Sequence, residues 1–94
     1  MFVQLQDGKT LVNMDTVSSI YIPDADDNTI FFAIEGLKAG YIAGKYNSKA
    51  ATEYMFRSLR GGIMEGIDFL FMHSADDVDE ILAKRNTGEG NDVG

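Results

Sequence analysis

The chain has 94 residues, 45% of them apolar, a net charge of −7 and no cysteine. This length and apolar content are typical of one globular domain, and the lack of cysteine excludes disulfides, thiolate catalysis and cysteine–zinc sites. No stretch approaches the roughly 20 apolar residues of a membrane helix, and the N-terminus lacks a secretory signal, so we expect a cytoplasmic protein without membrane contact.

The negative charge is concentrated towards the C-terminus. Between Arg60 and Lys84 there are six carboxylates and no lysine or arginine. Proteins that bind nucleic acid directly need clustered Lys and Arg to displace counterions from phosphates, so nucleic acid is disfavoured as a ligand. A protein partner with a basic surface fits this charge, although the same charge can serve solubility alone.

The first half of the chain predicts a series of short strands, because apolar and polar residues alternate there. The predicted strands are 2–6, 10–14, 17–22, 29–35 and 41–46. Asp7-Gly8 suits a tight hairpin turn between the first two strands, and Pro23 ends the third.

The pattern changes to helical spacing after Asn47 and Ser48, either of which is a suitable N-cap for a helix to about Arg60. Gly61-Gly62 predicts the end of this helix, because glycine readily takes the left-handed conformation. An apolar stripe is expected to face the sheet and comprises Met55, Phe56, Leu59 and Ile63.

The remaining sequence predicts one more strand at 67–72 and a second helix at 75–85. Ser74 is the expected N-cap, with Asp77 three residues further on. Acidic residues in the first turns complement the helix dipole. The polar, glycine-rich segment 86–94 is expected to be a disordered tail.

Together these elements predict an α+β fold in which residues 1–85 form a single domain. A small antiparallel sheet of four to five strands would pack on one helix, followed by a C-terminal strand and the second helix. The sheet face towards the helix is predicted to carry Val3, Leu5, Ile20, Ile22, Ile30, Phe32, Ile34 and Ile42.

The opposite face of this sheet is more apolar than a face in water usually is. It is predicted to carry Phe2, Val17, Tyr21, Phe31, Ala33 and Tyr41. Exposed apolar area of this kind typically marks an interface. Either the segment 63–85 of the same chain or a second molecule can cover it, and the pattern favours neither.

No combination of residues predicts an enzyme, a metal site or a cofactor. Four residues have the oxygen spacing of an EF-hand loop: Asp24, Asp26, Asn28 and Glu35. However, Thr29 occupies the position that requires glycine, and strands flank the loop instead of helices. His73 is the only histidine, so no two-histidine metal pair can form, and Ser74 beside it is better explained as a helix cap.

The most distinctive local sequence is YIAGKYNSKAA at Tyr41–Ala51. With Asp7-Gly8-Lys9, Val12–Asp15 and Ile20, it resembles small phage and bacterial proteins built from a strand–turn–strand unit, an Asn-x-Asp step, further strands, and Gly-Lys-Tyr before a helix. The chain is also loosely similar to small flagellar FlbD-type proteins, which share the turn glycine, the Asn-x-Asp step and a glycine hairpin. The resemblance covers residues 2–60 and implies an architecture without catalytic residues.

We therefore expect a non-enzymatic protein–protein interaction module, encoded by a phage, that inhibits or modulates a host protein in the host cytoplasm. The alternative is a self-associating structural or assembly protein, with a homodimer covering the outer sheet face. An enzyme centred on His73 is a third hypothesis.

The expected partner-binding residues are aromatic side chains of the outer sheet face and carboxylates of the second helix. They are Phe2, Tyr21, Phe31, Tyr41, Asp76, Asp77, Asp79 and Glu80. The four carboxylates can instead serve only solubility and the helix dipole.

Overall fold

The computed structural model describes the backbone of residues 1–93 and the side chains of residues 1–85. In chain order its elements are β1 (Phe2–Gln4), β2 (Leu11–Asn13), a 3-10 helix (Met14–Thr16), β3 (Val17–Tyr21), β4 (Thr29–Ile34), β5 (Tyr41–Lys45), α1 (Lys49–Glu65), β6 (Phe69–Phe71) and α2 (Ala75–Val93). The predicted α+β class is confirmed. None of the helices in this part of the chain is long and apolar enough to cross a membrane.

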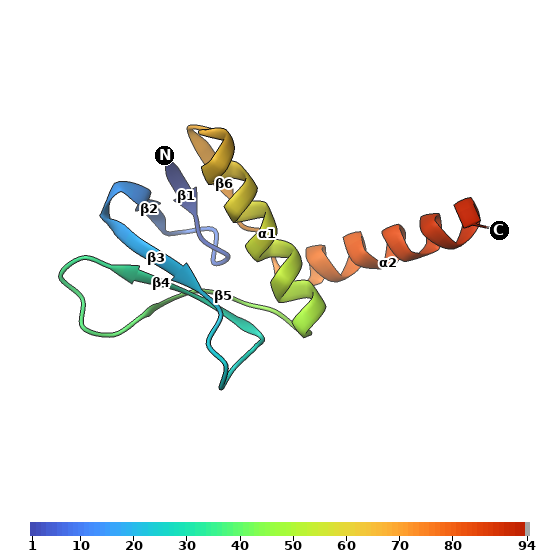
Figure 1. Cartoon of the computed structure of the whole chain (residues 1–94), viewed down its shortest axis with the longest axis horizontal. Helices are drawn as coiled ribbons and strands as arrows, with labels where there is room; N and C mark the ends of the chain where they lie inside the picture. Colours follow the sequence, from blue (N-terminus) through green and yellow to red (C-terminus); the bar gives the residue numbers. More distant parts are fainter. Residues whose placement is uncertain (94) are drawn as a thin grey trace.

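The strands form two three-stranded sheets, where the sequence predicted one. Sheet A has the order β2-β1-β6, and sheet B has the order β3-β4-β5. β1 pairs antiparallel with β2 but parallel with β6, whereas sheet B is antiparallel throughout. The prediction of a single antiparallel sheet is therefore wrong, because the predicted C-terminal strand is an integral part of sheet A. Figure 1 shows β1, β2 and β6 above the three strands of sheet B.

Gln6 links the two sheets just beyond β1. Its backbone N–H donates to the carbonyl of Ala43 (N···O 3.3 Å). Its side-chain Oε1 accepts from the N–H of Lys45 at 2.8 Å, and its Nε2 donates to the Lys45 carbonyl. The side-chain amide thus takes the place of a backbone peptide beside β5, because it offers one acceptor and one donor in the same way.

The helix α1 packs on both sheets around one core, and in Figure 1 it lies between sheet B and α2. Ser48 is the N-cap, and its Oγ accepts from the N–H of Ala51 at 3.1 Å. Met55 and Leu59 are buried as predicted, but Ile63 is 43% exposed, so the predicted stripe is wrong at its C-terminal end. The core also contains Val3, Leu5, Val12, Ile30, Phe32, Ala43, Tyr46, Met72 and Val78.

One strand of sheet B differs from the predicted alternation. The register between β4 and β5 shifts at Ile30/Phe31, so that Ile30 pairs with Gly44 while Phe31 pairs with Ile42. Such a bulge inserts one residue and turns the neighbouring side chains to the other face. Ala43 is therefore buried and Ile42 is exposed, which makes the prediction of Ile42 as a core residue wrong.

Gly61-Gly62 lies inside α1, so the predicted helix end at this pair is also wrong. Gly66 ends the helix instead, in the left-handed conformation (φ 70°). Gly62 is buried, and a Cβ added there would lie 2.9 Å from the Cδ1 atoms of both Ile67 and Leu70. The missing side chain at Gly62 therefore lets the chain entering β6 approach α1 closely.

The second helix begins as predicted and continues further. Ser74 caps it, with its Oγ accepting from the N–H of Asp77 at 3.1 Å. The backbone stays helical to Val93, so the predicted end at Arg85 is wrong. The side chains of 86–94 lie outside the described residues, and the division into a domain at 1–85 and a disordered tail stays a prediction.

The two adjacent glycines of α1 give a matched test of this packing. Gly61→Ala should stabilise the protein by about 0.5–1 kcal/mol, because nothing lies within 4 Å of the added Cβ and alanine favours the helix. Gly62→Ala should lack this gain and be less stable than Gly61→Ala by about 1 kcal/mol or more, because its Cβ displaces Ile67 and Leu70. Urea unfolding of both variants measures the difference. Equal stabilisation at both positions would contradict the close approach.

A second pair of substitutions tests the buried face of α1. Leu59→Ala should lower the free energy of unfolding by about 2–5 kcal/mol, because Leu59 is fully buried. Ile63→Ala, at the partly exposed end of the predicted stripe, should cost under about 1 kcal/mol. Chemical denaturation of both variants would show a mistaken helix face if the two costs were reversed.

Candidate interaction surface

The four aromatic residues expected on one sheet face lie on two different sheets. Phe2 is on β1 of sheet A, whereas Tyr21, Phe31 and Tyr41 belong to the three strands of sheet B. The predicted carboxylates lie in a third place, the first two turns of α2. In Figure 1, α2 extends to the side opposite sheet B. The predicted set therefore does not form one continuous surface.

Two aromatic rings of sheet B, Tyr21 and Phe31, pack partly against each other and against their own chain. Tyr21 and Phe31 are in register on β3 and β4, and their rings stack with centroids 5.6 Å apart and planes 15° apart. Gly40, in the loop before β5, lies against both rings, since an added Cβ would overlap the Tyr21 hydroxyl and the Phe31 ring. Tyr21 nevertheless stays 38% exposed, and Tyr41 and Ile42 of β5 are exposed as well.

A second apolar face lies on sheet A and draws on all three of its strands. Its large side chains are each about half exposed: Phe2 46%, Leu11 58%, Phe69 50% and Phe71 54%. We call these four residues the outer face. In register, Phe2 lies beside Phe69, and Gln4 lies between Leu11 and Phe71. Neighbouring side chains on one sheet face are close enough to act together.

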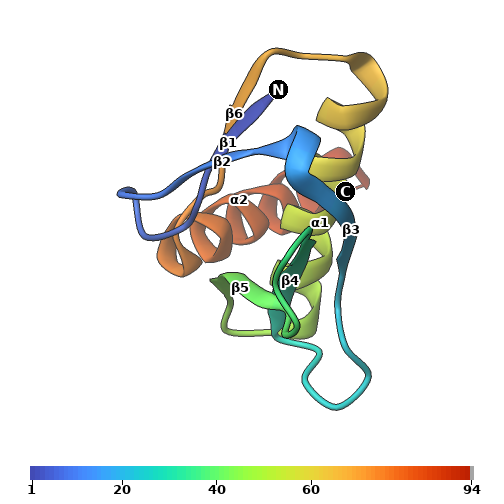
Figure 2. The ribbon, with the colours of Figure 1, turned by 90° about the vertical axis from the view of Figure 1, so that its left-hand side faces the viewer.

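The inner face of the same strands explains why the outer face is exposed. Val3, Val12 and Leu70 alternate with the outer-face residues and pack towards the core. Figure 2 shows α1 on one side of β1, β2 and β6. Because side chains alternate strictly along a strand, burying one set against α1 directs the other set to the opposite side.

Of these four residues, the sequence pattern identified Phe2 as a binding residue but not Leu11, Phe69 or Phe71. A signal was present in the alternation of Phe69 and Phe71 with Leu70, which is typical of a strand with one buried face. The parallel pairing of β6 with β1 was the missing information, because only that pairing brings these rings beside Phe2. The segment 63–85 thus extends sheet A instead of covering the predicted outer face.

Two of the four predicted carboxylates have partners within the chain. The Oδ2 of Asp79 accepts from Nδ2 of Asn47 at 2.7 Å and so ties α2 to the residues before α1. Glu80 pairs with Lys84 at 3.1 Å, one turn further along an exposed side of α2. Asp76 and Asp77 are exposed in the first turn, where the helix dipole favours negative charge.

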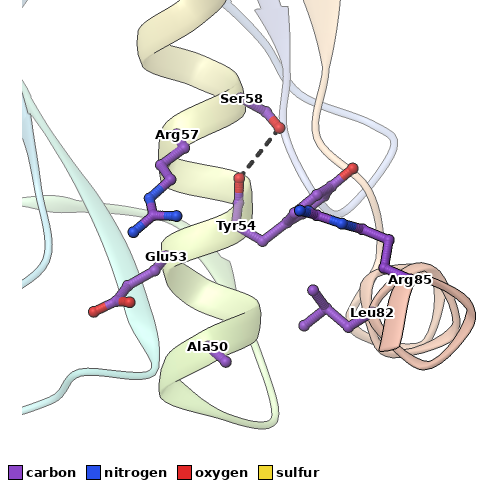
Figure 3. A pocket seen from close by; sticks show the side chains of 7 residues that line it. All are labelled: Ala50, Glu53, Tyr54, Arg57, Ser58, Leu82 and Arg85. Carbon is purple, nitrogen blue, oxygen red and sulfur yellow. Dashed lines mark hydrogen bonds between the residues drawn. The ribbon is translucent and has the colours of Figure 1, made fainter. Parts of the chain in front are cut away.

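A hollow of about 460 Å³ lies between α1 and α2. The guanidinium of Arg85 lies over the ring of Tyr54, with its Cζ 5.7 Å from the centroid. Figure 3 shows Tyr54 on the side of α1 that faces α2, whereas Glu53 and Arg57 point to the other side. The two arginines therefore do not converge, as they would in a clamp for an anionic ligand.

The residues that the sequence offered as possible metal ligands or catalytic groups make structural contacts in the described part of the chain. Asp26 accepts hydrogen bonds from the Thr29 hydroxyl and the Asn28 N–H, which lower the pKa of its carboxyl and close the hairpin loop. His73 packs edge-on against Phe71, with ring centroids 5.2 Å apart. Among the described residues, no cluster of three or more His, Asp or Glu could hold a metal ion.

Tyr46 fixes the junction between β6 and α2. Its hydroxyl donates to the carbonyl of His73 at 2.9 Å. Burial raises the pKa of the Tyr46 phenol, because the charged form would lose its hydration. The group therefore remains a neutral hydrogen-bond donor, and it ties the residue that follows β5 to the segment between β6 and α2.

Comparison with known proteins yields no relative: no protein family, no curated protein and no solved structure matches the chain. The resemblance to small phage and bacterial proteins and to FlbD-type proteins therefore stays a prediction. The outer face of sheet A is the feature of the described structure from which a function can be inferred.

The carboxylates of α2 should differ in their contribution to stability. Asp79→Ala should cost about 1 kcal/mol, because it removes the hydrogen bond to Asn47. Asp76→Ala removes only an interaction with the helix dipole, which salt screens, so at high salt it should cost about 0.3 kcal/mol or less. Thermal unfolding of the two variants at high salt compares them. Equal melting temperatures would show that the Asn47 contact contributes nothing.

Proposed function

We propose that this protein is a non-enzymatic protein–protein interaction module that binds its partner through the outer face of sheet A. The supporting observation is the set of four large apolar side chains, each about half exposed, on three neighbouring strands. Several large apolar side chains exposed together on one sheet face typically mark an interaction site. Aromatic residues are also the ones that most often dominate binding energy at interfaces.

The energy available from this face is moderate. Fully burying one such side chain contributes about 1.5–3 kcal/mol, so covering the exposed halves of four gives roughly 3–6 kcal/mol. Association itself costs about 4–15 kcal/mol of translational and rotational freedom. The face can therefore anchor a partner, but polar or backbone contacts must add to it.

Charge supports a basic partner. The net charge of −7 would attract a positively charged surface and increase the rate of encounter. We retain the proposal that the partner is a host protein, inhibited or modulated by a phage-encoded module in the host cytoplasm. Its support is the resemblance of residues 2–60 and the acidic composition.

Self-association is the second candidate, and the same outer face favours it. A two-fold dimer buries one patch from each copy, so an apolar face can be covered by its own equivalent. This function needs no host target and would make the module a structural or assembly protein.

Affinity capture with matched baits separates these possibilities. We expect wild-type protein and Leu37→Ser, altered at an exposed loop residue of sheet B, to retain the same protein from a lysate of the source cells. Phe69→Thr/Phe71→Thr should lose it, while the β-branched threonines preserve the strand. Light scattering of each bait reports self-association. Retention of the same protein by the double variant would refute the outer-face proposal.

A further inference from the structure

We propose that the partner contributes an extended, basic segment that pairs with the free edge of β6 and lengthens sheet A by one strand. This inference rests on the proposed function and adds the conformation and the chemistry of the partner. The backbone hydrogen bonds of an added strand are the polar contacts that the apolar face by itself lacks.

The hydrogen bonds of β6 identify its free edge. The N–H of Phe2 donates to the carbonyl of Asp68 at 2.9 Å, and the N–H of Met72 donates to the carbonyl of Gln4 at 2.8 Å. Peptide groups along a strand point alternately to its two edges. The N–H and C=O groups of Phe69 and Phe71 therefore point away from β1, to a side where the described chain places no strand.

β6 is also less protected than the edges of sheet B. Natural edge strands carry lysine, proline or bulges that prevent pairing with another chain. The edge strand β3 has an irregular register near Ser18, and β5 ends at Lys45 and is bridged by Gln6. The sequence of β6, Phe-Leu-Phe, contains none of these features.

An added strand would meet the outer face through every second side chain. Residues of that strand on the same side as Phe69 and Phe71 would lie beside the two rings, where apolar and aromatic neighbours are favoured. The partner's segment should therefore carry apolar residues at alternate positions, a requirement that follows from the pleat of the strand alone.

Both ends of this edge are acidic. Asp68 directly precedes β6 and is exposed. At the other end, Asp76 and Asp77 follow β6 in the first turn of α2. Figure 1 shows α2 leaving that end of β6. Lysine or arginine near both ends of the partner's segment would complement these carboxylates.

The same charges argue against a second copy of this chain on the edge. Two β6 strands paired antiparallel about a two-fold axis at Leu70 would bring Asp68 of each copy towards the α2 start of the other, where Asp76 and Asp77 lie. Like charges placed opposite each other destabilise an interface. The edge and the apolar face are self-complementary, but the charges at the two ends are not.

Strand addition can be tested with two short synthetic peptides and the whole protein. In one peptide valine alternates with lysine and arginine, and in the other it alternates with glutamate. We expect the basic peptide to slow amide hydrogen exchange at Phe69 and Phe71 by about tenfold or more, measured by NMR at low salt. The amides of Leu70 and Met72 already bond to β1 and should change little. The glutamate peptide should bind at least about tenfold more weakly, because its charges oppose the carboxylates.

A substitution pair isolates the backbone contact from the aromatic ring. Phe71→Thr and Phe71→Pro both remove the ring, but only proline removes the N–H that points to the free edge. Phe71→Thr should retain part of the affinity for the basic peptide, and Phe71→Pro should lose it, with melting temperatures confirming that both variants fold.

Each contrary result has a defined meaning. Absence of binding by the basic peptide, while lysate capture still depends on Phe69 and Phe71, would overturn strand addition and leave the proposed function intact. Protection at these amides that appears only with rising protein concentration would make a second copy the occupant and overturn the inference. Equal binding of both peptides would overturn its basic component, and capture that is indifferent to the outer face would refute the proposed function itself.

Discussion

The parallel pairing of β6 with β1 determines both the core and the exposed face of this protein. It carries Leu70 to the inner side, next to Val3, and at the same time sets Phe69 beside Phe2 on the outer side. β6 does not follow β1 directly in the chain, and α1 returns the chain from β5 to the start of β6. The outer face is a consequence of that return.

The return depends on how closely α1 approaches the strand that follows it. Gly62 leaves room for Ile67 and Leu70, and Gly66 then reverses the chain in a left-handed conformation. A glycine inside a helix costs about 1 kcal/mol relative to alanine, so its presence at Gly62 is explained by packing. Two glycine positions thus determine where β6 lies, and with it the composition of the exposed face.

Local features of this fold could be predicted from the sequence, and non-local ones could not. Ser48 and Ser74 cap their helices because a hydroxyl three residues before an N–H is a complete, local interaction. The strands follow from alternation in the same way. The pairing of β6 with β1, the bulge at Ile30/Phe31 and the helical glycine at Gly62 depend on contacts between distant segments. A pattern of apolar residues contains no information about these contacts.

The same difference between local and non-local features applies to the candidate site. Phe2 was predicted because its own strand alternates, whereas its neighbour Phe69 comes from 67 positions further along the chain. The predicted carboxylates differ individually in their contacts: Asp79 and Glu80 have side-chain partners, whereas Asp76 and Asp77 have none among the described side chains of residues 1–85. Asp76 and Asp77 are the two of these carboxylates that lie nearest to β6 in the chain. The number of charges in the sequence does not reveal this difference.

An unprotected edge beside an apolar face is a hazard for any protein, because identical edges pair and aggregate. Here the protection lies in the charge around the edge instead of within the strand. A net charge of −7 opposes the close approach of a second copy, and the carboxylates at both ends of β6 disfavour a two-fold arrangement at this edge. The same charges would attract the basic segment proposed for the edge. One electrostatic feature can thus prevent self-pairing and select the partner, and the three-residue strand stays available without lysine or proline in it.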